Sequence, residues 1–448
     1  MLFAYMFVDV MSPLQSLIQT QRGWSPDAFG YYAGAEYILN VFGFLILAGI
    51  ILDKMGVRFT GTLSASLMVG GAFIKLYAIS SVFEGTALDL WLSSWWTEMP
   101  GSAKLAAFGF MIFGCGCEMA GITVSKTLAK WFEGKEMALA MGLEMAIARI
   151  GVFAIFSISP RLAEWGGTPS VVPPVAFCAC LLCVGLLCYI VFTFMDYKLD
   201  KEMGESKADG EADDEEFKLS DVGAIFSSKL FWIIAMLCVL YYSAIFPFQR
   251  YAANMLQCNL GITETQASDI FRWFPIGAAC LTPFLGWFLD NKGKGASMLI
   301  LGAILMIVCH LTFAFVVPST KSEVLTYSAI VVLGISFSLV PAALWPSVPK
   351  VMDKRFLGSA YSLIFWVQNI GLAFVPIIIG KVLTASNPGV TDPMKYDYTA
   401  PMCVFASLGV LALIFGIVLK AMDARKHYGL EKPNIIKDYE EMRIDGEA

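Results

Sequence analysis

The stretch "GIILDKMGVR" (Gly49–Arg58) decides how this chain folds, because a related stretch, "GWFLDNKGKG", begins at Gly286. Three positions of the two copies match at one constant offset: Gly49 with Gly286, Asp53 with Asp290, and Gly56 with Gly293. Each copy follows one long apolar run and precedes another. A charged, glycine-containing connection that recurs between apolar runs predicts two related halves, with a tight turn between helices in each.

The composition places those helices in a membrane. The chain has 448 residues, of which 57% are hydrophobic and only 15% charged, whereas soluble domains carry about 25% charged residues. The apolar runs are about 20 residues long, which is enough to cross a bilayer. The net charge of −6 comes from acidic stretches near 205–221 and in the tail, and neither suggests a nucleic-acid partner.

The apolar runs predict twelve membrane spans. Their approximate limits are 1–20, 31–52, 60–82, 103–126, 138–159, 171–195, 229–250, 267–289, 296–317, 325–346, 356–383 and 399–420. We expect an N-terminal six-helix bundle (1–195), an acidic linker (196–228), a C-terminal six-helix bundle (229–420) and a tail (421–448). Twelve spans place both termini, the linker and the tail on one side of the membrane, and most of the 31 Lys and Arg residues fall on that side. Because basic residues are enriched on the cytoplasmic side, we expect the linker, the tail and both termini to be cytoplasmic.

Further repeats support two homologous halves. "SPLQ" in span 1 resembles "FPFQ" in span 7, and "GLEMAIARIG" in span 5 resembles "SLIFWVQNIG" in span 11. The predicted fold is therefore an all-α integral membrane protein of twelve helices in two pseudo-symmetric six-helix bundles. Such proteins are transporters whose site lies between the halves, near mid-membrane.

The connection after span 2 also has the pattern G-x-x-x-D-K-x-G-x-R, the signature of the major facilitator superfamily. We expect its glycines to allow the turn, Asp53 to lie at a helix N-terminus, and the basic residues to hold the loop at the cytosolic face. A short basic loop without further role is the alternative. The expected cytoplasmic gating motif comprises Gly49, Asp53, Lys54, Gly56, Arg58 and Asp290.

We single out seven ionisable residues inside predicted spans, because such residues are functional candidates. They are Asp9, Glu36, Lys75, Glu118, Glu144, Arg149 and His310. Glu118 and Arg149 each lie twelve residues, or about 18 Å, from the turn between spans 4 and 5, and so at one depth. They could form a neutralising ion pair, or they could bind the amino and carboxyl groups of a zwitterion, since arginine grips a carboxylate with two hydrogen bonds.

The other charges have simpler interpretations. Glu144 lies about 140° around the helix from Arg149, so we expect it to pair with Lys126 instead. Asp9 and Glu36 could carry protons or only hydrogen-bond to a neighbour. We expect Lys75 to snorkel outward. We expect His310 to be a core histidine.

The second half offers hydrogen-bonding and aromatic candidates. Span 7 carries Tyr242 in "YYSAIFPFQ", and span 11 carries Gln368 and Asn369. Trp345 in span 10 could form a flat wall of the site or be an interfacial anchor. Asn369 is the repeat partner of Arg149, so the N-terminal half supplies charge and the C-terminal half supplies hydrogen bonds.

Several of these stretches resemble a family of lysosomal dipeptide transporters within the major facilitator superfamily. They are "VDVMSPLQSLIQ", "KWFEGKEMALAMGLEMAIARIG", "YYSAIFPF", "ALWPSVPKV" and "LGSAYSLIFWVQNIG". The resemblance implies dipeptide transport by alternating access, with Glu118 and Arg149 holding the two ends of the peptide and Trp345 matching a family tryptophan. The loop "FEGTALDLWLSSWWTEMPGSA" and Glu144 depart from the family pattern, and the short termini favour a prokaryotic relative.

We therefore expect a transporter of small zwitterionic solutes, most specifically dipeptides, with no cofactor and no metal. An alternative is a proton-coupled organic anion or monocarboxylate transporter, in which Arg149 alone binds the carboxylate. An enzyme is disfavoured because the chain has two histidines and no catalytic motif. A nutrient receptor that does not transport is a further alternative, but no added signalling domain supports it. We expect a monomer in the lipid bilayer of the cell membrane, or of the lysosome if the source is eukaryotic.

Overall fold

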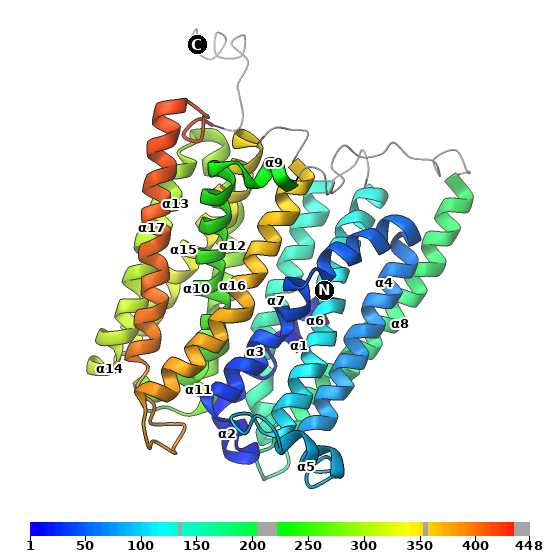
Figure 1. Cartoon of the computed structure of the whole chain (residues 1–448), viewed down its shortest axis with the longest axis vertical. Coiled ribbons are helices and arrows are strands. Elements are labelled where there is room, and N and C mark those ends of the chain that lie inside the picture. The colour runs from blue at the N-terminus through cyan, green and yellow to red at the C-terminus, as the bar shows by residue number, and fades with distance from the viewer. Residues whose placement is uncertain (133–136, 204–221, 353–356, 434–448) are drawn as a thin grey trace.

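The computed structural model describes residues 1–132, 137–203, 222–352 and 357–433, and within these ranges it contains helices and no strands. The helices form two bundles that stand side by side (Figure 1). One bundle holds the elements from α1 to α8, and the other holds those from α9 to α17. This arrangement confirms the predicted all-α architecture.

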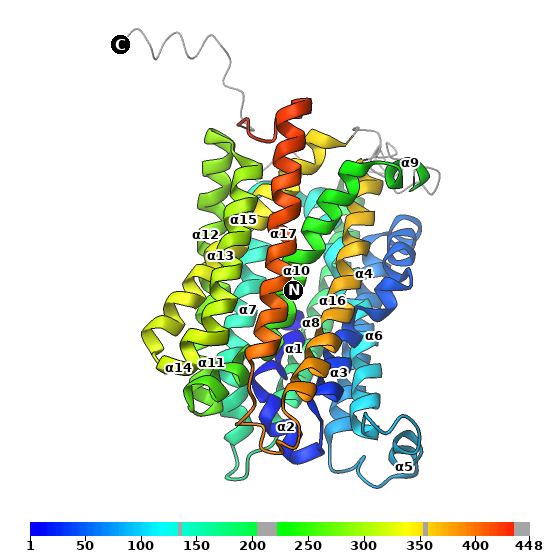
Figure 2. The same ribbon diagram turned by 60° about the vertical axis from the view of Figure 1, so that its left-hand side comes forward.

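The N-terminal half contains eight α-helices and one 3₁₀ turn in its described part. Their bounds are α1 Leu2–Asp9, η1 Ser12–Leu14, α2 Gln15–Arg22, α3 Pro26–Val41, α4 Phe44–Ile79, α5 Ala87–Ser93, α6 Gly101–Phe132, α7 Met137–Glu164 and α8 Val172–Met203. The short α5 lies at the end of the bundle remote from α9 (Figure 2).

The C-terminal half repeats this plan. Its elements are α9 Val222–Phe226, α10 Lys229–Leu260, α11 Glu264–Phe271, α12 Trp273–Lys292, α13 Gly295–Leu311, the π-helical segment η4 Thr312–Val316, α14 Val317–Thr320, α15 Glu323–Val351, α16 Leu357–Ser386 and α17 Thr399–Lys426. Pro247, Pro283, Pro341 and Pro376 lie inside these helices without ending them.

Nine helices in the described ranges are long and apolar enough to cross a membrane. Each of the other three predicted spans is divided between successive helices. Span 1 breaks around Pro13, which lacks a backbone N–H, and span 2 breaks at Gly43, whose φ of 96° suits only glycine. Span 8 is shared by α11 and α12.

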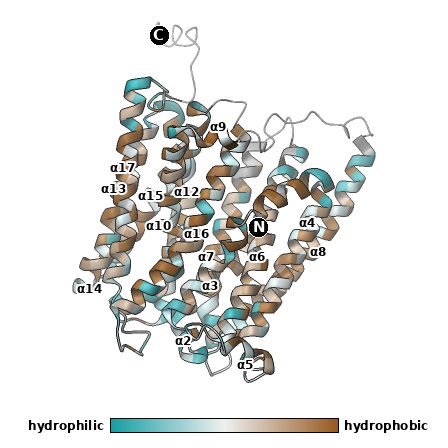
Figure 3. Cartoon of the chain, viewed as in Figure 1, coloured by the Kyte–Doolittle hydropathy of each residue, from teal (hydrophilic) through white to brown (hydrophobic). Residues whose placement is uncertain are grey.

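The helices are mostly apolar along their length and more polar at their ends (Figure 3). Large side chains such as Phe194 and Val324 are more than two-thirds exposed. A soluble protein rarely exposes so much contiguous apolar surface, whereas lipid chains cover it without penalty.

We call the end of the molecule where α8 and α17 end and α10 begins the linker face, and the other end the opposite face (Figure 1). α8 continues beyond the predicted boundary at 195 as far as Met203. The tail packs back on the C-terminal half after α17, where Leu430 donates its backbone N–H to Asp423 and Lys350 donates to the carbonyl of Gly429. Residues 204–221 of the linker and 434–448 of the tail lie outside the described residues.

The repeated turn is used twice, as predicted. Gly56 has φ 73° and Gly293 has φ 72°, a conformation that side chains disfavour. In the first copy the turn lies within α4, which bends at Gly56 as the chain passes from span 2 to span 3.

Candidate functional site

Near the opposite face, the two halves pack closely against each other. α3 of the N-terminal half packs against α16 of the C-terminal half through Gly30, Gly34 and Gly380, which we call the glycine seam. A methyl group on Gly30 would lie 2.6 Å from the carbonyl oxygen of Pro376, where ordinary contacts begin at 3.4 Å. The backbones of the two halves therefore touch directly here.

Polar contacts close the same face beside the seam. The Arg161 guanidinium on α7 pairs with the Asp269 carboxylate on α11 at 2.7 Å. The Thr265 hydroxyl donates to Glu164 at 3.0 Å. Both contacts join the two halves, so this face is shut.

A cavity of about 720 Å³ lies between the halves toward the linker face. α4 lines one side with the stretch around Gly49, Asp53 and Lys54, and α6 adds Ile122. α16 lines the other side from Tyr361 to Trp366. The molecule is thus closed at the opposite face and hollow between its halves toward the linker face.

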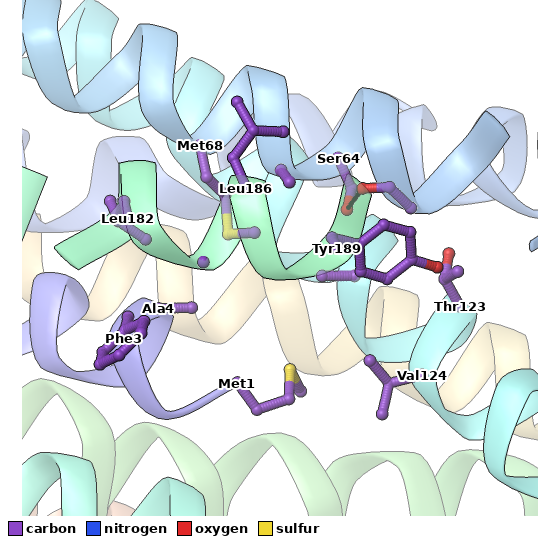
Figure 4. A pocket seen from close by; sticks show the side chains of 14 residues that line it. Met1, Phe3, Ala4, Ser64, Met68, Thr123, Val124, Leu182, Leu186 and Tyr189 are labelled. Atoms are coloured by element: carbon purple, nitrogen blue, oxygen red, sulfur yellow. Dashed lines mark hydrogen bonds between the residues drawn. The ribbon is translucent and has the colours of Figure 1, made fainter. Parts of the chain in front are cut away.

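A smaller hollow of about 90 Å³ lies inside the N-terminal half, between α1, α4, α6 and α8 (Figure 4). Its lining is apolar except for Ser64, Thr123 and Tyr189, and it contains none of the predicted site residues. We therefore look for the site at the cavity between the halves.

Glu118 lies one helical turn deeper than Ile122 on the same side of α6. Its carboxylate has neither an ion pair nor a hydrogen bond to any described residue. The glycines before it allow close helix packing, as predicted. A methyl group on Gly114 would overlap the backbone of Glu36 on α3, and one on Gly116 would lie 2.6 Å from the carbonyl oxygen of Ser64 on α4.

Arg149 on the neighbouring α7 has no ion partner among the described residues either. Its guanidinium carbon lies 4.7 Å from the ring centroid of Phe337 and 5.8 Å from that of Phe246, both in the C-terminal half. Glu118 and Arg149 therefore do not form the ion pair that would neutralise both. Each offers a free charge, and the arginine is held across the boundary between the halves.

Phe337 and Phe246 belong to an aromatic wall, of which the sequence analysis predicted only Tyr242 and Trp345. Its members are Tyr242 and Phe246 of α10, Phe337 and Trp345 of α15, and Tyr361 and Phe365 of α16. The Trp345 indole N–H donates to the Tyr242 hydroxyl at 3.2 Å, and its ring stacks on Phe365 at 4.8 Å. Trp345 thus packs within the wall.

The two amides of α16 lie beside this wall and are buried. The Gln368 side-chain oxygen accepts from the Cys238 thiol at 3.3 Å. Asn369, one turn beyond Phe365, donates to the Phe365 carbonyl at 2.9 Å, but its side-chain oxygen has no partner among the described residues. That oxygen is a free acceptor close to the wall.

Asp9 and Glu36 meet a residue that the sequence analysis missed, Arg250. The Arg250 guanidinium lies 3.2 Å from Asp9 and 2.6 Å from Glu36, and Gln249 donates to Asp9 at 2.6 Å. All three charged side chains are at least nine-tenths buried. Arg250 was overlooked because span 7 was predicted to end there, whereas α10 continues to Leu260.

Two predictions about single charges are wrong. Lys75 does not snorkel outward; it is fully buried and surrounded by aromatic rings. Lys126 does not pair with Glu144, because its ammonium group lies 2.7 Å from the Asp53 carboxylate on α4. His310 is a core histidine as predicted, packed between the rings of Phe248 and Phe405.

The predicted gating motif is tied to its neighbours by charge. Arg58 pairs with Asp200 at 2.8 Å and with Asp196 at 3.4 Å, and Lys130 binds the same two carboxylates of α8. Asp53 does not lie at a helix N-terminus as expected, because it falls inside α4 in the turn before Gly56, and its charge is balanced by Lys126. In the second copy, Lys294, four residues after Asp290, donates its backbone N–H to the Glu431 carbonyl at 3.0 Å. The ion pairs of the first copy join α4, α6 and α8 at the linker face.

Comparisons with known proteins agree with this architecture. The family model described as Major Facilitator Superfamily matches residues 1–257 and 248–438. The chain is 30% identical to the lysosomal dipeptide transporter MFSD1 of Danio rerio over 398 residues, covering 85% of this chain and 77% of the relative. It is 28% identical to MFSD1 of Homo sapiens over 426 residues, covering 91% and 81%.

Solved structures share the fold. The nucleoside transporter NupG superposes with a TM-score of 0.69 at 13% identity, covering 93% of this chain and 97% of that one. A bacterial homologue of the human lysosomal transporter Spinster superposes with a TM-score of 0.69 at 11% identity, covering 95% of each chain. With its two helical bundles, its repeated turn and these matches, the chain belongs to the major facilitator superfamily and is a multi-pass membrane transporter, not an enzyme.

Proposed function

We propose that this transporter moves small zwitterionic solutes, most specifically dipeptides, by alternating access. Glu118 binds the amino group and Arg149 binds the carboxylate. The observation that carries the proposal is that these opposite charges, on adjacent helices beside the inter-half cavity, both lack a partner among the described residues. A charge without a partner inside a membrane span is costly, and a substrate with two charged ends would supply both partners at once.

The remaining contacts come from the C-terminal half. Trp345 and Tyr242 hold the body of the peptide against the aromatic wall, and Gln368 and Asn369 bind its polar groups. The free oxygen of Asn369 can accept a hydrogen bond from a peptide N–H. The similarity to proteins named lysosomal dipeptide transporters supports the same substrate class.

The gating role of Gly49, Asp53, Lys54, Gly56, Arg58 and Asp290 is part of the proposal, as are a cytoplasmic linker face and a monomer in the bilayer. The membrane is the cell membrane of a prokaryote, or the lysosomal membrane in a eukaryote. New contacts between the halves would form at the linker face as the halves rock around the site. Asp9 and Glu36, the candidates for carrying protons, are engaged with Arg250 in the closed face.

The test uses ligands that differ at one end. Purified protein is heated with Ala-Ala, with N-acetyl-Ala-Ala, with Ala-Ala amide and with lactate, since a ligand that binds the native state raises the melting temperature. Ala-Ala should bind about 10- to 100-fold more tightly than either capped peptide, because a hydrogen bond to a charged group contributes about 1.5–3 kcal/mol.

Two variants assign the ends. Glu118→Gln should make the protein indifferent to the acetyl cap, and Arg149→Gln should make it indifferent to the amide. Glu144→Gln, a partly buried glutamate on α7 with no ion partner in the described ranges, is the matched control and should behave as wild type. If only carboxylates without an amino group raise the melting temperature, and Glu118→Gln leaves lactate binding intact, the organic anion alternative is correct.

A further inference from the structure

Lys75 is the buried charge that neither the site nor the seam explains. Its side chain is fully buried, and its ammonium nitrogen has no hydrogen-bond partner among the described residues. It lies 4.2 Å from the ring centroid of Phe7, 4.7 Å from that of Phe110 and 5.1 Å from that of Tyr32. An aromatic ring stabilises a desolvated ammonium by about 2 kcal/mol, so the three rings offset much of the several kcal/mol of desolvation, but they supply no counter-charge.

The rings around Lys75 lead directly to the Arg250 cluster. Phe7 is two residues before Asp9 on α1, and Tyr32 is one turn before Glu36 on α3. Phe110 is contacted by both cations, because the Arg250 guanidinium carbon lies 5.6 Å from its ring centroid. Within the cluster, the Arg250 charge repels the Lys75 ammonium group, and the Glu36 and Asp9 carboxylates attract it. The lysine therefore belongs to the same buried cluster although it makes no direct ion pair.

The charges of this cluster balance only when Lys75 is counted. Asp9 and Glu36 contribute two negative charges, and Arg250 contributes one positive charge. When both buried carboxylates are ionised, a single arginine between them leaves one negative charge uncompensated. Lys75 supplies the missing positive charge. It comes from the N-terminal half, so it stays with the carboxylates when the C-terminal half and Arg250 move away.

We propose that Lys75 is a positioning residue of transport. It is the second cation of a neutral cluster that also contains Asp9, Glu36 and Arg250. Its charge lets both carboxylates bind Arg250 at the same time when the opposite face is closed. The proposal rests on the cluster alone and not on the identity of the substrate. Removal of the lysine charge should weaken the closed face, and removal of one carboxylate charge as well should restore it.

The test is a double-mutant cycle of the charges at Lys75 and Glu36 in the full-length protein. Its readout is hydrogen exchange at α11 and at the start of α3, which reports opening of the opposite face. Lys75→Met and Glu36→Gln should each speed exchange about tenfold or more. The double variant carries the wild-type charge balance and should return to within about threefold of the wild-type rate. If Lys75→Met does not fold, a folded double variant is the expected result.

A matched control separates charge balance from packing. Lys104 on α6 also lies over a ring, 4.2 Å from the Trp95 centroid, but its ammonium group donates to the backbone carbonyls of Leu92 and Trp95. Lys104→Met should therefore not rescue Glu36→Gln. The proposal is overturned if the double variant of Lys75 and Glu36 opens as fast as Lys75→Met or fails to fold, or if Lys75→Met exchanges like wild type.

Discussion

Replacement of Gly30 by alanine tests whether the glycine seam holds the opposite face closed. The new methyl carbon would lie 2.6 Å from the Pro376 carbonyl oxygen, 3.0 Å from the Tyr251 hydroxyl oxygen and 3.3 Å from the Gly380 Cα atom. All three atoms belong to the C-terminal half, and two of them are backbone atoms that cannot rotate away. The clash can be relieved only if α3 and α16 move apart.

The size of the effect follows from that displacement. The contact must lengthen by roughly 1 Å to become ordinary, and overpacking of this kind costs about 1–3 kcal/mol. The cost applies only to the state in which the opposite face is closed, because the two helices separate when that face opens. An energy difference of about 1–3 kcal/mol shifts an equilibrium by about 5- to 150-fold. The variant should therefore favour opening of this face by that factor.

Hydrogen exchange followed by mass spectrometry measures the shift. Backbone amides of α11 and of the first turns of α3 should exchange faster by the same factor, since exchange reports the fraction of time a segment is open. Gly70→Ala is the matched control, because it adds a methyl to a helical glycine with nothing within 4 Å. Equal exchange rates in Gly30→Ala and wild type would refute the argument that backbone contact at the seam closes this face.

Two further predictions concern single residues. Phe337→Leu should weaken dipeptide binding about 5- to 30-fold, because it removes a cation–π contact of about 1–2 kcal/mol. In an Arg149→Ala background the same substitution should not change binding further. Equal losses in thermal-shift titrations of both backgrounds would show that Phe337 does not act through Arg149. Gly56→Ala should lower stability by about 1–3 kcal/mol, because φ 73° with ψ 172° is a conformation open essentially to glycine; an unchanged melting temperature would contradict this.

The sequence predicted the repeated features well because they depend on local chemistry. Apolar runs of membrane length and a glycine turn in each half follow from the residues themselves, and the turns at Gly56 and Gly293 have the expected backbone. The free charges on Glu118 and Arg149 were one of two interpretations that spacing allowed. Helical spacing indicates which residues share a face, but it does not say what lies opposite that face.

The errors came from contacts between helices that are distant in sequence. Lys126 was assigned to Glu144 across a single hairpin, whereas Asp53 reaches it from α4. Lys75 was expected outside, yet rings from α1, α3 and α6 enclose it. Arg250 was placed at a helix end because the apolar pattern weakens there, while packing carries the helix ten residues further.

The sequence by itself therefore determined that this chain crosses a membrane, that it has two related halves, and which charges would be too costly to leave without a role in lipid. Only the tertiary structure decided how those charges are used. It joined Asp9, Glu36 and Arg250 across the halves, and it left Glu118 and Arg149 without partners in the described chain. The reason is physical: burial cost is a property of a residue type, whereas compensation depends on which helices pack together.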